Sequence, residues 1–289
     1  EIGGLLSFGI PDFKLELQVM RRRREILEGS GVHFRLNCEI GRDIQASELE
    51  TMHDALFFGL GTYKPVEASL PGMEEGGIVP ALEYLIGQTC HLYGMDLPGF
   101  PFIDLAGEEV LVLGGGDTAM DCVRTAIRQG AASVRCVYRR DQQNMPGSQR
   151  EVKHAMNEGV QFEFNSLPLG LVHEDRKLVG LDIAKTRLVA SPDGRAQPEV
   201  IPGSEQRLPA SAVIFAFGYR PSPPGWLDAL VRLYAEGRWD YPDRDRRTGF
   251  SVVLFGAHGL HYAHPPQDLV AELLGRPGVT SIQITFHED

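Results

Sequence analysis

A run of three glycines directly after a short apolar segment constrains the fold of this chain more than any other feature. Residues 109–113 read EVLVL, and Gly114-Gly115-Gly116-Asp117 follows. The apolar segment predicts a buried strand, the glycines predict a tight turn, and residues 118–129 predict a helix that ends at Gly130. Residues 133–138 predict a second strand. The sequence therefore predicts a strand–turn–helix–strand unit of about thirty residues, the size of a βαβ unit.

The glycine turn has the spacing of a dinucleotide-binding loop. Gly114, Gly116 and Ala119 fit G-x-G-x-x-A between a strand and a helix, which is the context that this motif requires. The first glycine permits the turn, the second leaves room for a pyrophosphate, and the small alanine lets the helix pack on the strand. The helix N-terminus presents free N–H groups to the phosphate. We expect a dinucleotide here; the alternatives are a structural glycine turn and a methyltransferase-like nucleoside site.

The end of the second strand indicates which dinucleotide is bound. An NAD site usually has Asp or Glu at this point to accept the ribose hydroxyls. Here the strand ends in Tyr138-Arg139-Arg140, and Asp141 comes only after the arginines. Two guanidiniums suit a 2′-phosphate by charge and by forked hydrogen bonding, and they can also stack on adenine. The sequence predicts NADP(H) rather than NAD(H); the alternative is a basic strand end in contact with solvent.

Composition limits the class of protein and its partners. The 289 residues suit about two domains, and the net charge of −11 argues against a general nucleic-acid or anionic-membrane binder. No apolar segment is long enough to span a bilayer. The four cysteines have no CxxC spacing, so we expect reduced thiols in a cytoplasmic protein and no metal or iron–sulfur site within this chain. The first residue is Glu1 and no signal peptide follows, so we expect the natural protein to begin upstream.

The remaining segments predict further helices and strands. Helices are expected at residues 19–29 and 80–93, and a third is expected after Ser148, where Ser148 and Glu151 fit a capping box. The loops rich in Gly and Pro between residues 94 and 106 suggest a hinge or domain boundary. Further strands are predicted at residues 32–36, 55–59, 162–165, 178–187 and 212–217.

Several longer motifs resemble one known family. They are GGLLSFGIPDFK from Gly3, GLGTY from Gly59, LGGGDTAMDC from Leu113, YRRD from Tyr138, NMPGSQREV from Asn144 and AFGYRP from Ala216. Together they resemble the NADPH-dependent glutamate synthase small chain and related NADPH-dependent FAD–iron–sulfur oxidoreductase subunits. Those relatives include iron–sulfur-linked accessory subunits and the flavin half of dihydropyrimidine dehydrogenase. The resemblance runs from Ile2 to about Trp226.

The resemblance implies an α/β flavoprotein of the disulfide-reductase type, with two nested Rossmann-like dinucleotide-binding domains. Residues 1–105 would hold the later part of the first FAD segment and a linker, residues 106–218 the NADPH domain, and residues 219–289 the closing FAD segment. The family's own FAD glycine motif and its cysteine-rich cluster domain precede the region of resemblance. We therefore expect an N-terminally truncated chain with an incomplete FAD domain.

The closing segment departs from the family. The family's FAGGD element, whose Asp approaches the flavin, is matched here by residues 254–259, which read LFGAHG and contain no Asp. We expect a diverged segment there. His258, His261 and His264 recur at intervals of three, but Gly259 and the two prolines after His264 argue against a helical metal site.

The resemblance also implies an activity. The chain would pass a hydride from NADPH to FAD, and electrons would leave through iron–sulfur clusters of the N-terminal domain to a partner subunit, a large chain or another redox partner. Its role would be glutamate biosynthesis in the cytoplasm, with no nucleic-acid or membrane partner. No general acid or base is assigned, because hydride chemistry belongs to the cofactors. The alternative is an NADP(H)-binding fragment that holds no FAD and has no turnover by itself.

Matching positions carry the candidate cofactor-binding residues. Those expected at the NADPH phosphates are Gly114, Gly115, Gly116, Asp117, Thr118 and Ala119. Those expected at the 2′-phosphate are Arg139 and Arg140, and those beside the nucleotide are Ala216, Phe217 and Gly218. Those expected near FAD are Gly59, Gly61, Thr62 and Lys14. Glu151 is a candidate for the nicotinamide end, although we expect the capping box to occupy its carboxylate.

Overall fold

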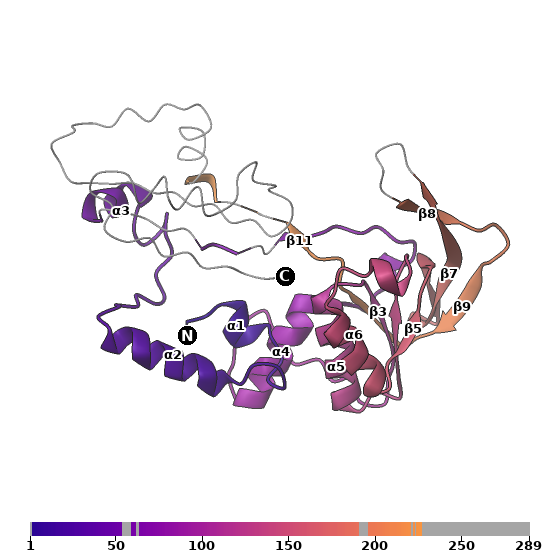
Figure 1. Ribbon diagram of the computed structural model, residues 1–289, viewed down its shortest axis with the longest axis horizontal. Helices are drawn as coiled ribbons and strands as arrows, with labels where there is room; N and C mark the ends of the chain where they lie inside the picture. Colours follow the sequence, from indigo (N-terminus) through magenta and orange to yellow (C-terminus); the bar gives the residue numbers. More distant parts are fainter. Residues whose placement is uncertain are drawn as a thin grey trace. The chain divides into compact units, whose positions relative to one another are not determined.

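The computed structural model describes residues 2–53, 59–61, 64–190, 196–220, 222 and 224–226 (Figure 1). The chain divides into a larger unit, Glu1–Phe34 with Val66–Gly218, and a smaller unit, Arg35–Pro65 with Tyr219–Asp289. Several predictions lie outside the described residues: the strand at residues 55–58, Thr62, the segment at residues 254–259 and the three histidines His258, His261 and His264.

The described elements have the following bounds. The helices are α1 (Leu5–Phe8), α2 (Leu17–Gly29), α3 (Ala46–Met52), α4 (Ala81–Tyr93), α5 (Asp117–Gln129) and α6 (Gln149–Asn157), with 3-10 turns at Met73–Glu75 and Gln142–Asn144. The strands are β1 (Lys64–Pro65), β2 (Ile78–Pro80), β3 (Glu109–Leu113), β4 (Ser133–Val137), β5 (Gln161–Glu163), β6 (Ser166–Glu174), β7 (Lys177–Ala190), β8 (Ala196–Val200), β9 (Gln206–Pro209), β10 (Ala212–Phe215) and β11 (Tyr219–Arg220).

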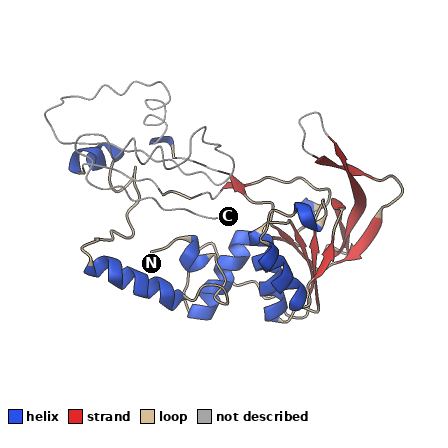
Figure 2. Ribbon diagram, viewed as in Figure 1, coloured by secondary structure: helices blue, strands red, loops and turns tan. Residues whose placement is uncertain are grey.

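The larger unit is built on a parallel sheet with strand order β2-β10-β3-β4-β5. Alternate residues of β3 face opposite sides of this sheet. Val110 and Val112 pack in one core with residues of α4, α5 and α6, whereas Leu111 and Leu113 pack in a second core with residues of β6, β7 and β9. Both faces of the sheet are therefore covered, as a parallel sheet requires. The helices lie on one side and an antiparallel sheet on the other (Figure 2).

The predicted βαβ unit is confirmed in the structure. The expected strands correspond to β3 and β4, and they pair in parallel from Glu109↔Ser133 to Leu113↔Val137. Helix α5 lies between them and ends at Gly130, whose φ of 90° suits a residue without Cβ. Helices α2 and α4 are also confirmed, and so are the predicted strands that correspond to β5, β7 and β10.

The strand predicted at residues 32–36 is wrong, because this segment is irregular. The alternation of apolar and polar residues there does not reflect one buried face. Val32 is 41% exposed and Leu36 is 38% exposed. Without a buried face or a hydrogen-bonded neighbour among the described strands, the pattern has nothing to stabilise it as a strand.

Residues 94–106 are irregular as predicted, but they pack closely on α4 and α5. A Cβ at Gly87 would lie 2.2 Å from the Pro101 carbonyl oxygen. The Gln129 side chain accepts a hydrogen bond from Leu105 N–H at 3.1 Å and donates one to the Ile103 carbonyl at 3.1 Å. Helices on both sides of the loop belong to the larger unit. A domain boundary at residues 105–106 remains a prediction.

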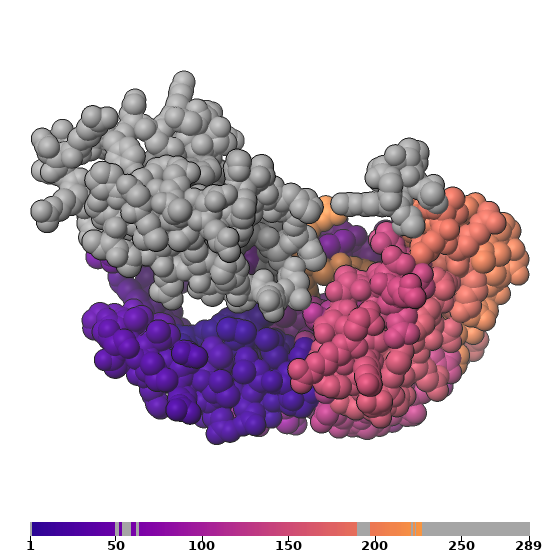
Figure 3. Space-filling view, in the orientation of Figure 1, coloured from indigo at the N-terminus to yellow at the C-terminus, as the bar shows by residue number. Residues whose placement is uncertain are grey.

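Segments that are distant in sequence form one continuous surface within the larger unit, where the N-terminal helices meet the α5–α6 region (Figure 3). Phe13 contributes to this junction, because the guanidinium carbons of Arg124 and Arg128 lie over its ring, 4.5 and 4.2 Å from the ring centroid. In the described part of the chain, no helix combines the length and apolar character needed to cross a membrane.

The smaller unit contains one short antiparallel pair and one capped helix among its described residues. Strands β1 and β11 pair through Lys64↔Arg220 and Pro65↔Tyr219. Helix α3 begins with a capping box, in which the Glu48 carboxylate accepts a hydrogen bond from Gln45 N–H at 2.7 Å.

Candidate nucleotide-binding site

The three glycines of the loop serve different purposes. Gly114 has a φ of 151°, and a Cβ there would lie 2.3 Å from the Ala216 carbonyl oxygen. A Cβ at Gly115 would lie 2.5 Å from the ring of Tyr138. These two positions exclude a side chain because the protein itself fills the space. Gly116 differs, because a Cβ there would meet no atom within 4 Å. The open side of the loop is therefore at Gly116, where the motif places the phosphate.

The N-terminus of α5 offers free donors beside this opening. The Gly116 carbonyl accepts hydrogen bonds from Ala119 N–H at 3.0 Å and Met120 N–H at 3.2 Å. Within the described residues, no acceptor is found for the N–H groups of Gly116, Asp117 and Thr118. The first N–H groups of a helix lack intrahelical acceptors, and they bind anions well. The Asp117 carboxylate has another role, because it accepts a hydrogen bond from Ser148 N–H at 2.9 Å.

A second loop, residues 144–148, is fastened to the glycine loop. Gly147 N–H donates to the Gly115 carbonyl at 2.9 Å, and a Cβ at Gly147 would lie at the same distance from that oxygen. The Tyr138 hydroxyl donates to the Asn144 carbonyl at 2.7 Å. Tyr138 and Gly147 thus shape the site, although no role was predicted for either residue from the sequence. The motif NMPGSQREV contains Gly147, but only the fold shows why a glycine is needed there.

The basic end of β4 lies one strand away from the glycine loop. Arg139 is exposed and Arg140 is half-buried. Arg140 Nε is a buried donor for which the described residues provide no acceptor. The neighbouring Asp141 is already engaged, because its carboxylate accepts hydrogen bonds from Asn144 N–H at 2.9 Å and from the Asn144 side-chain amide at 2.8 Å. These hydrogen bonds lower the pKa of Asp141. The strand end therefore presents guanidiniums, and Asn144 engages one oxygen, Oδ1, of the nearest carboxylate.

The structure places the residues that follow β10 beside the glycine loop. Strand β3 has β4 on one side and β10 on the other, and such a change in strand order is where α/β sheets bind ligands. Ala216 N–H donates to the Leu113 carbonyl at 2.9 Å, next to Gly114. Phe217 is 37% exposed, and Gly218 has a φ of 89°. These three residues thus extend β10 at the same edge of the sheet as Gly114.

The predicted capping box at α6 is wrong. Ser148 is the N-cap residue, but its side chain makes no capping hydrogen bond. The Glu151 carboxylate instead accepts a hydrogen bond from Arg124 at 2.6 Å and lies 3.6 Å from Lys14 Nζ. The Arg124 side chain is 7% exposed. A buried guanidinium needs a carboxylate partner more than a backbone N–H does, so Glu151 faces Arg124.

Lys14 is held by the same group of charges, which lies within the larger unit. Its ammonium donates to Asp121 at 2.8 Å. The other residues proposed for the FAD side, Gly59 and Gly61, are exposed residues of the smaller unit. The structure therefore brings Lys14 together with Asp121 and Glu151, and it does not bring the FAD-side candidates together within one unit.

The buried Asp121 predicts a specific pH dependence of stability. Burial raises its pKa to about 6, against the opposing effect of Lys14. The folded chain then binds the Asp121 proton more tightly than the unfolded chain does. The resulting stabilisation is complete below about pH 3.8 and is lost as the pH rises through about 6. Relative to Asp121→Asn, the wild-type chain should lose on the order of 2 kcal/mol of unfolding free energy between pH 4 and 7. Urea denaturation across this range measures it, and parallel profiles would contradict it.

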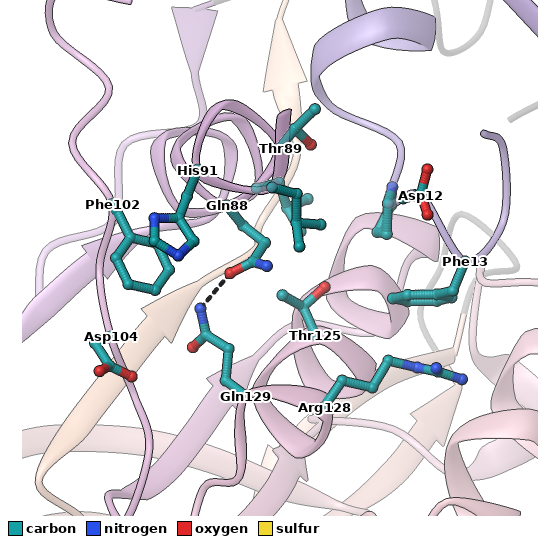
Figure 4. Close-up of a pocket in the computed structure, with 13 residues that line it drawn as sticks. Asp12, Phe13, Gln88, Thr89, His91, Phe102, Asp104, Thr125, Arg128 and Gln129 are labelled. Carbon is teal, nitrogen blue, oxygen red and sulfur yellow. Dashed lines mark hydrogen bonds between the residues drawn. The ribbon is translucent and has the colours of Figure 1, made fainter. Parts of the chain in front are cut away.

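A cavity beside α5 is separate from the glycine loop. It has a volume of about 390 Å³ and lies between residues 11–13, α4, residues 102–104 and the C-terminal half of α5 (Figure 4). Its wall includes the hydrogen bond from Gln129 to Gln88 at 2.6 Å. The glycine loop is at the opposite end of α5, so this cavity is not the nucleotide site.

The four cysteines are free thiols. Three of them, Cys90, Cys122 and Cys136, are buried, and burial raises the pKa of the Cys136 thiol to about 12. Such thiols are unreactive and behave as small apolar side chains. Across the described ranges, no group of three or more His, Cys, Asp or Glu residues comes together as a metal site would require.

Comparison with known proteins agrees with the fold and the motifs. The chain is 51% identical over 246 residues to the glutamate synthase [NADPH] small chain of Halomonas elongata, and 50% identical over 248 residues to that of Escherichia coli; each match covers 84% of this chain and 52% of the relative. It is 51% identical over 233 residues to the putative oxidoreductase AegA of E. coli, covering 79% of this chain and 35% of AegA. The chain thus spans about half the length of the first two relatives, and the resemblance noted in the sequence is confirmed.

Solved structures and family profiles identify the fold. FprA of Mycobacterium tuberculosis, solved in complex with NADPH, superposes with a TM-score of 0.62 at 20% identity, over 77% of this chain and 63% of FprA. At that identity the likeness shows the fold alone, and it confirms the predicted α/β architecture. The profile of the pyridine nucleotide-disulphide oxidoreductase family matches residues 42–248. The chain therefore belongs to the pyridine nucleotide-disulphide oxidoreductase family.

Proposed function

We propose that this chain is the NADPH-binding part of an NADPH-dependent flavin oxidoreductase of the glutamate synthase small-chain type. One observation carries the proposal: a single edge of the parallel sheet presents the free amides of Gly116, Asp117 and Thr118 and, one strand away, the guanidiniums of Arg139 and Arg140. A pyrophosphate needs the first group, and a 2′-phosphate needs the second. The relatives named glutamate synthase [NADPH] small chain support the same cofactor.

The residues present fit the nucleotide. The open side of Gly116 admits a phosphate to the backbone, and the N-terminus of α5 supplies donors and a positive dipole. The orphaned Nε of Arg140 would gain an acceptor from an anionic oxygen, and a buried donor without a partner costs about 1–3 kcal/mol. Asn144 engages one oxygen of the Asp141 carboxylate, Oδ1, and Asp141 follows the two arginines in the sequence. The two guanidiniums favour NADP(H) over NAD(H).

When bound, NADPH supplies a hydride that FAD accepts. Gly114 and Gly115 would shape the turn, Ala119 would let α5 approach β3, and Ala216, Phe217 and Gly218 would border the nucleotide. On the flavin side we propose Gly59, Gly61, Thr62 and Lys14. Lys14 would act from a defined position, because its ammonium is held by Asp121.

In the whole protein, residues 106–218 would form the NADPH domain, and residues 1–105 and 219–289 would belong to the FAD domain. Iron–sulfur clusters of an N-terminal domain would carry electrons onward to a partner subunit. The relatives are named small chains, which supports a larger companion chain. A cytoplasmic location and a role in glutamate biosynthesis complete this proposal. The alternative is an NADP(H)-binding fragment without FAD and without turnover of its own. It is supported by the match to the E. coli relative, which covers 52% of that relative.

A visible spectrum of the purified chain distinguishes the two possibilities. If the chain retains FAD, it should be yellow, and NADPH should bleach the flavin band under anaerobic conditions. A colourless chain that binds NADPH in a fluorescence titration would favour the fragment alternative. A colourless chain that binds no NADPH would contradict both. Addition of free FAD to the colourless chain provides the control for loss of flavin during purification.

A further inference from the structure

The two arginines at the end of β4 are anchored from the second sheet. The ladder between β4 and β5 ends at Val137↔Glu163, so Arg139 and Arg140 lie beyond it. The Arg139 carbonyl accepts a hydrogen bond from the Thr186 hydroxyl of β7 at 2.8 Å. The Arg140 carbonyl accepts one from Asn165 N–H at 2.9 Å. The backbone that carries both guanidiniums is thus held by residues outside the βαβ unit.

The two anchors are themselves joined. Thr186 N–H donates to the Asn165 carbonyl at 2.7 Å, and Asn165 has a φ of 51°, which places it in a left-handed turn between β5 and β6. Arg139, Arg140, Asn165 and Thr186 therefore form one hydrogen-bonded clip, which we call the arginine clip. Through it, the position of β7 determines the course of the chain at the end of β4.

Thr186 has a hydroxyl where packing alone would favour an apolar side chain. Thr186 is 5% exposed, and Ala184, two residues earlier on the same face of β7, is buried too. A buried hydroxyl costs free energy unless it makes a hydrogen bond, and valine would fill the same space. The acceptor here is the Arg139 carbonyl. The polar atom is therefore used to hold the arginine backbone.

The adjacent cation of β7 is engaged elsewhere. The Lys185 ammonium lies 3.1 Å from the Glu163 carboxylate and donates to the Ser166 hydroxyl at 3.0 Å. Among the described residues, no ion pair is found for Arg139 or Arg140, so both guanidiniums are available to an anion. Their placement then depends on the arginine clip, because a guanidinium at the end of a long side chain follows any rotation of its backbone.

We infer that Thr186 is a positioning residue for recognition of the 2′-phosphate. Its hydroxyl fixes the Arg139 carbonyl, and the fixed backbone orients the guanidiniums of Arg139 and Arg140 without Thr186 itself touching the nucleotide. The inference rests on the proposed binding of NADP(H) at this strand end. It assigns part of the cofactor specificity to β7 of the antiparallel sheet, outside the dinucleotide-binding motif.

Two small ligands isolate the effect from flavin chemistry. Adenosine 2′,5′-bisphosphate has the 2′-phosphate and 5′-AMP lacks it, and calorimetric titration of the full 289-residue chain measures both affinities. The wild-type chain should prefer the bisphosphate. In Thr186→Val this preference should fall about threefold to tenfold, the value of one lost hydrogen bond, while the affinity for 5′-AMP stays the same. Thr186→Ser should restore the preference.

Controls separate positioning from general damage. Thr89→Val removes a hydroxyl from another buried threonine, on α4, and should leave the preference unchanged. Thr186→Ala provides a second variant if circular dichroism shows that Thr186→Val does not fold. A wild-type preference that persists undiminished in Thr186→Val or Thr186→Ala, or equal losses for both ligands, would overturn the inference alone. A wild-type chain without any preference would overturn the NADP(H) assignment and the inference with it.

Discussion

Replacing Arg139 and Arg140 together with serine is expected to weaken NADPH binding about a hundredfold or more and to change NADH binding little. Each guanidinium can give charge-assisted hydrogen bonds to a 2′-phosphate, worth about 1.5–3 kcal/mol apiece, and tenfold in affinity corresponds to about 1.4 kcal/mol. NADH has no phosphate at this position and would lose only stacking on the adenine. Dissociation constants from nucleotide fluorescence titrations measure the effect.

A matched control is the serine substitution of Arg207. This arginine belongs to the same unit, but its guanidinium pairs with Asp182 at 2.8 Å on β7. Arg207→Ser removes one cation without touching the strand end, so the affinity for NADPH should change less than about threefold, in line with a screened charge. Equal losses of NADPH and NADH affinity in the double variant would contradict the assignment of the two arginines to the 2′-phosphate.

Replacing Gly116 with valine is expected to abolish binding of both nucleotides and leave the melting temperature nearly unchanged. The backbone there has φ −89° and ψ 179°, an extended conformation open to any residue. The new side chain would meet no protein atom within 4 Å at its Cβ. It would occupy the space through which a pyrophosphate approaches the backbone, so affinities for NADPH and NADH should both fall by more than about a hundredfold.

Replacing Gly114 with valine should instead lower the stability of the fold. Its φ of 151° and the 2.3 Å approach of a Cβ to the Ala216 carbonyl predict a loss of unfolding free energy of about 1–3 kcal/mol or more. Thermal unfolding followed by circular dichroism compares the two variants. Full nucleotide affinity in Gly116→Val would show that the phosphate does not lie against this residue.

The sequence was sufficient where neighbouring residues along the chain act together. The strand β3, the glycine loop and helix α5 follow from an apolar segment, glycine content and helical spacing within about two dozen residues. Arg139 and Arg140 could be placed just after β4 because the end of a strand can be predicted from the residues next to it. The structure confirms the strands and the helix, whereas the binding roles of the glycines and of the two arginines stay predictions.

Local patterns failed where a distant partner competed. Ser148 and Glu151 have the spacing of a capping box, yet Arg124, 27 residues earlier, takes the Glu151 carboxylate. A pattern of four residues cannot show that α5 carries a buried guanidinium to α6. Residues 32–36 alternate as a strand does, but no buried face lies beneath them.

The sequence alone determined that a strand, a glycine turn and a helix would follow one another with the spacing of a dinucleotide-binding loop, and that two arginines would follow the next strand. Only the tertiary structure decided what each glycine is for. Gly114 and Gly115 are required by Ala216 and Tyr138, whereas Gly116 is open to a ligand. Only the fold, too, brings Thr186 to the Arg139 carbonyl. The reason is that short-range patterns specify backbone conformation, while the space around an atom depends on residues far away in the chain.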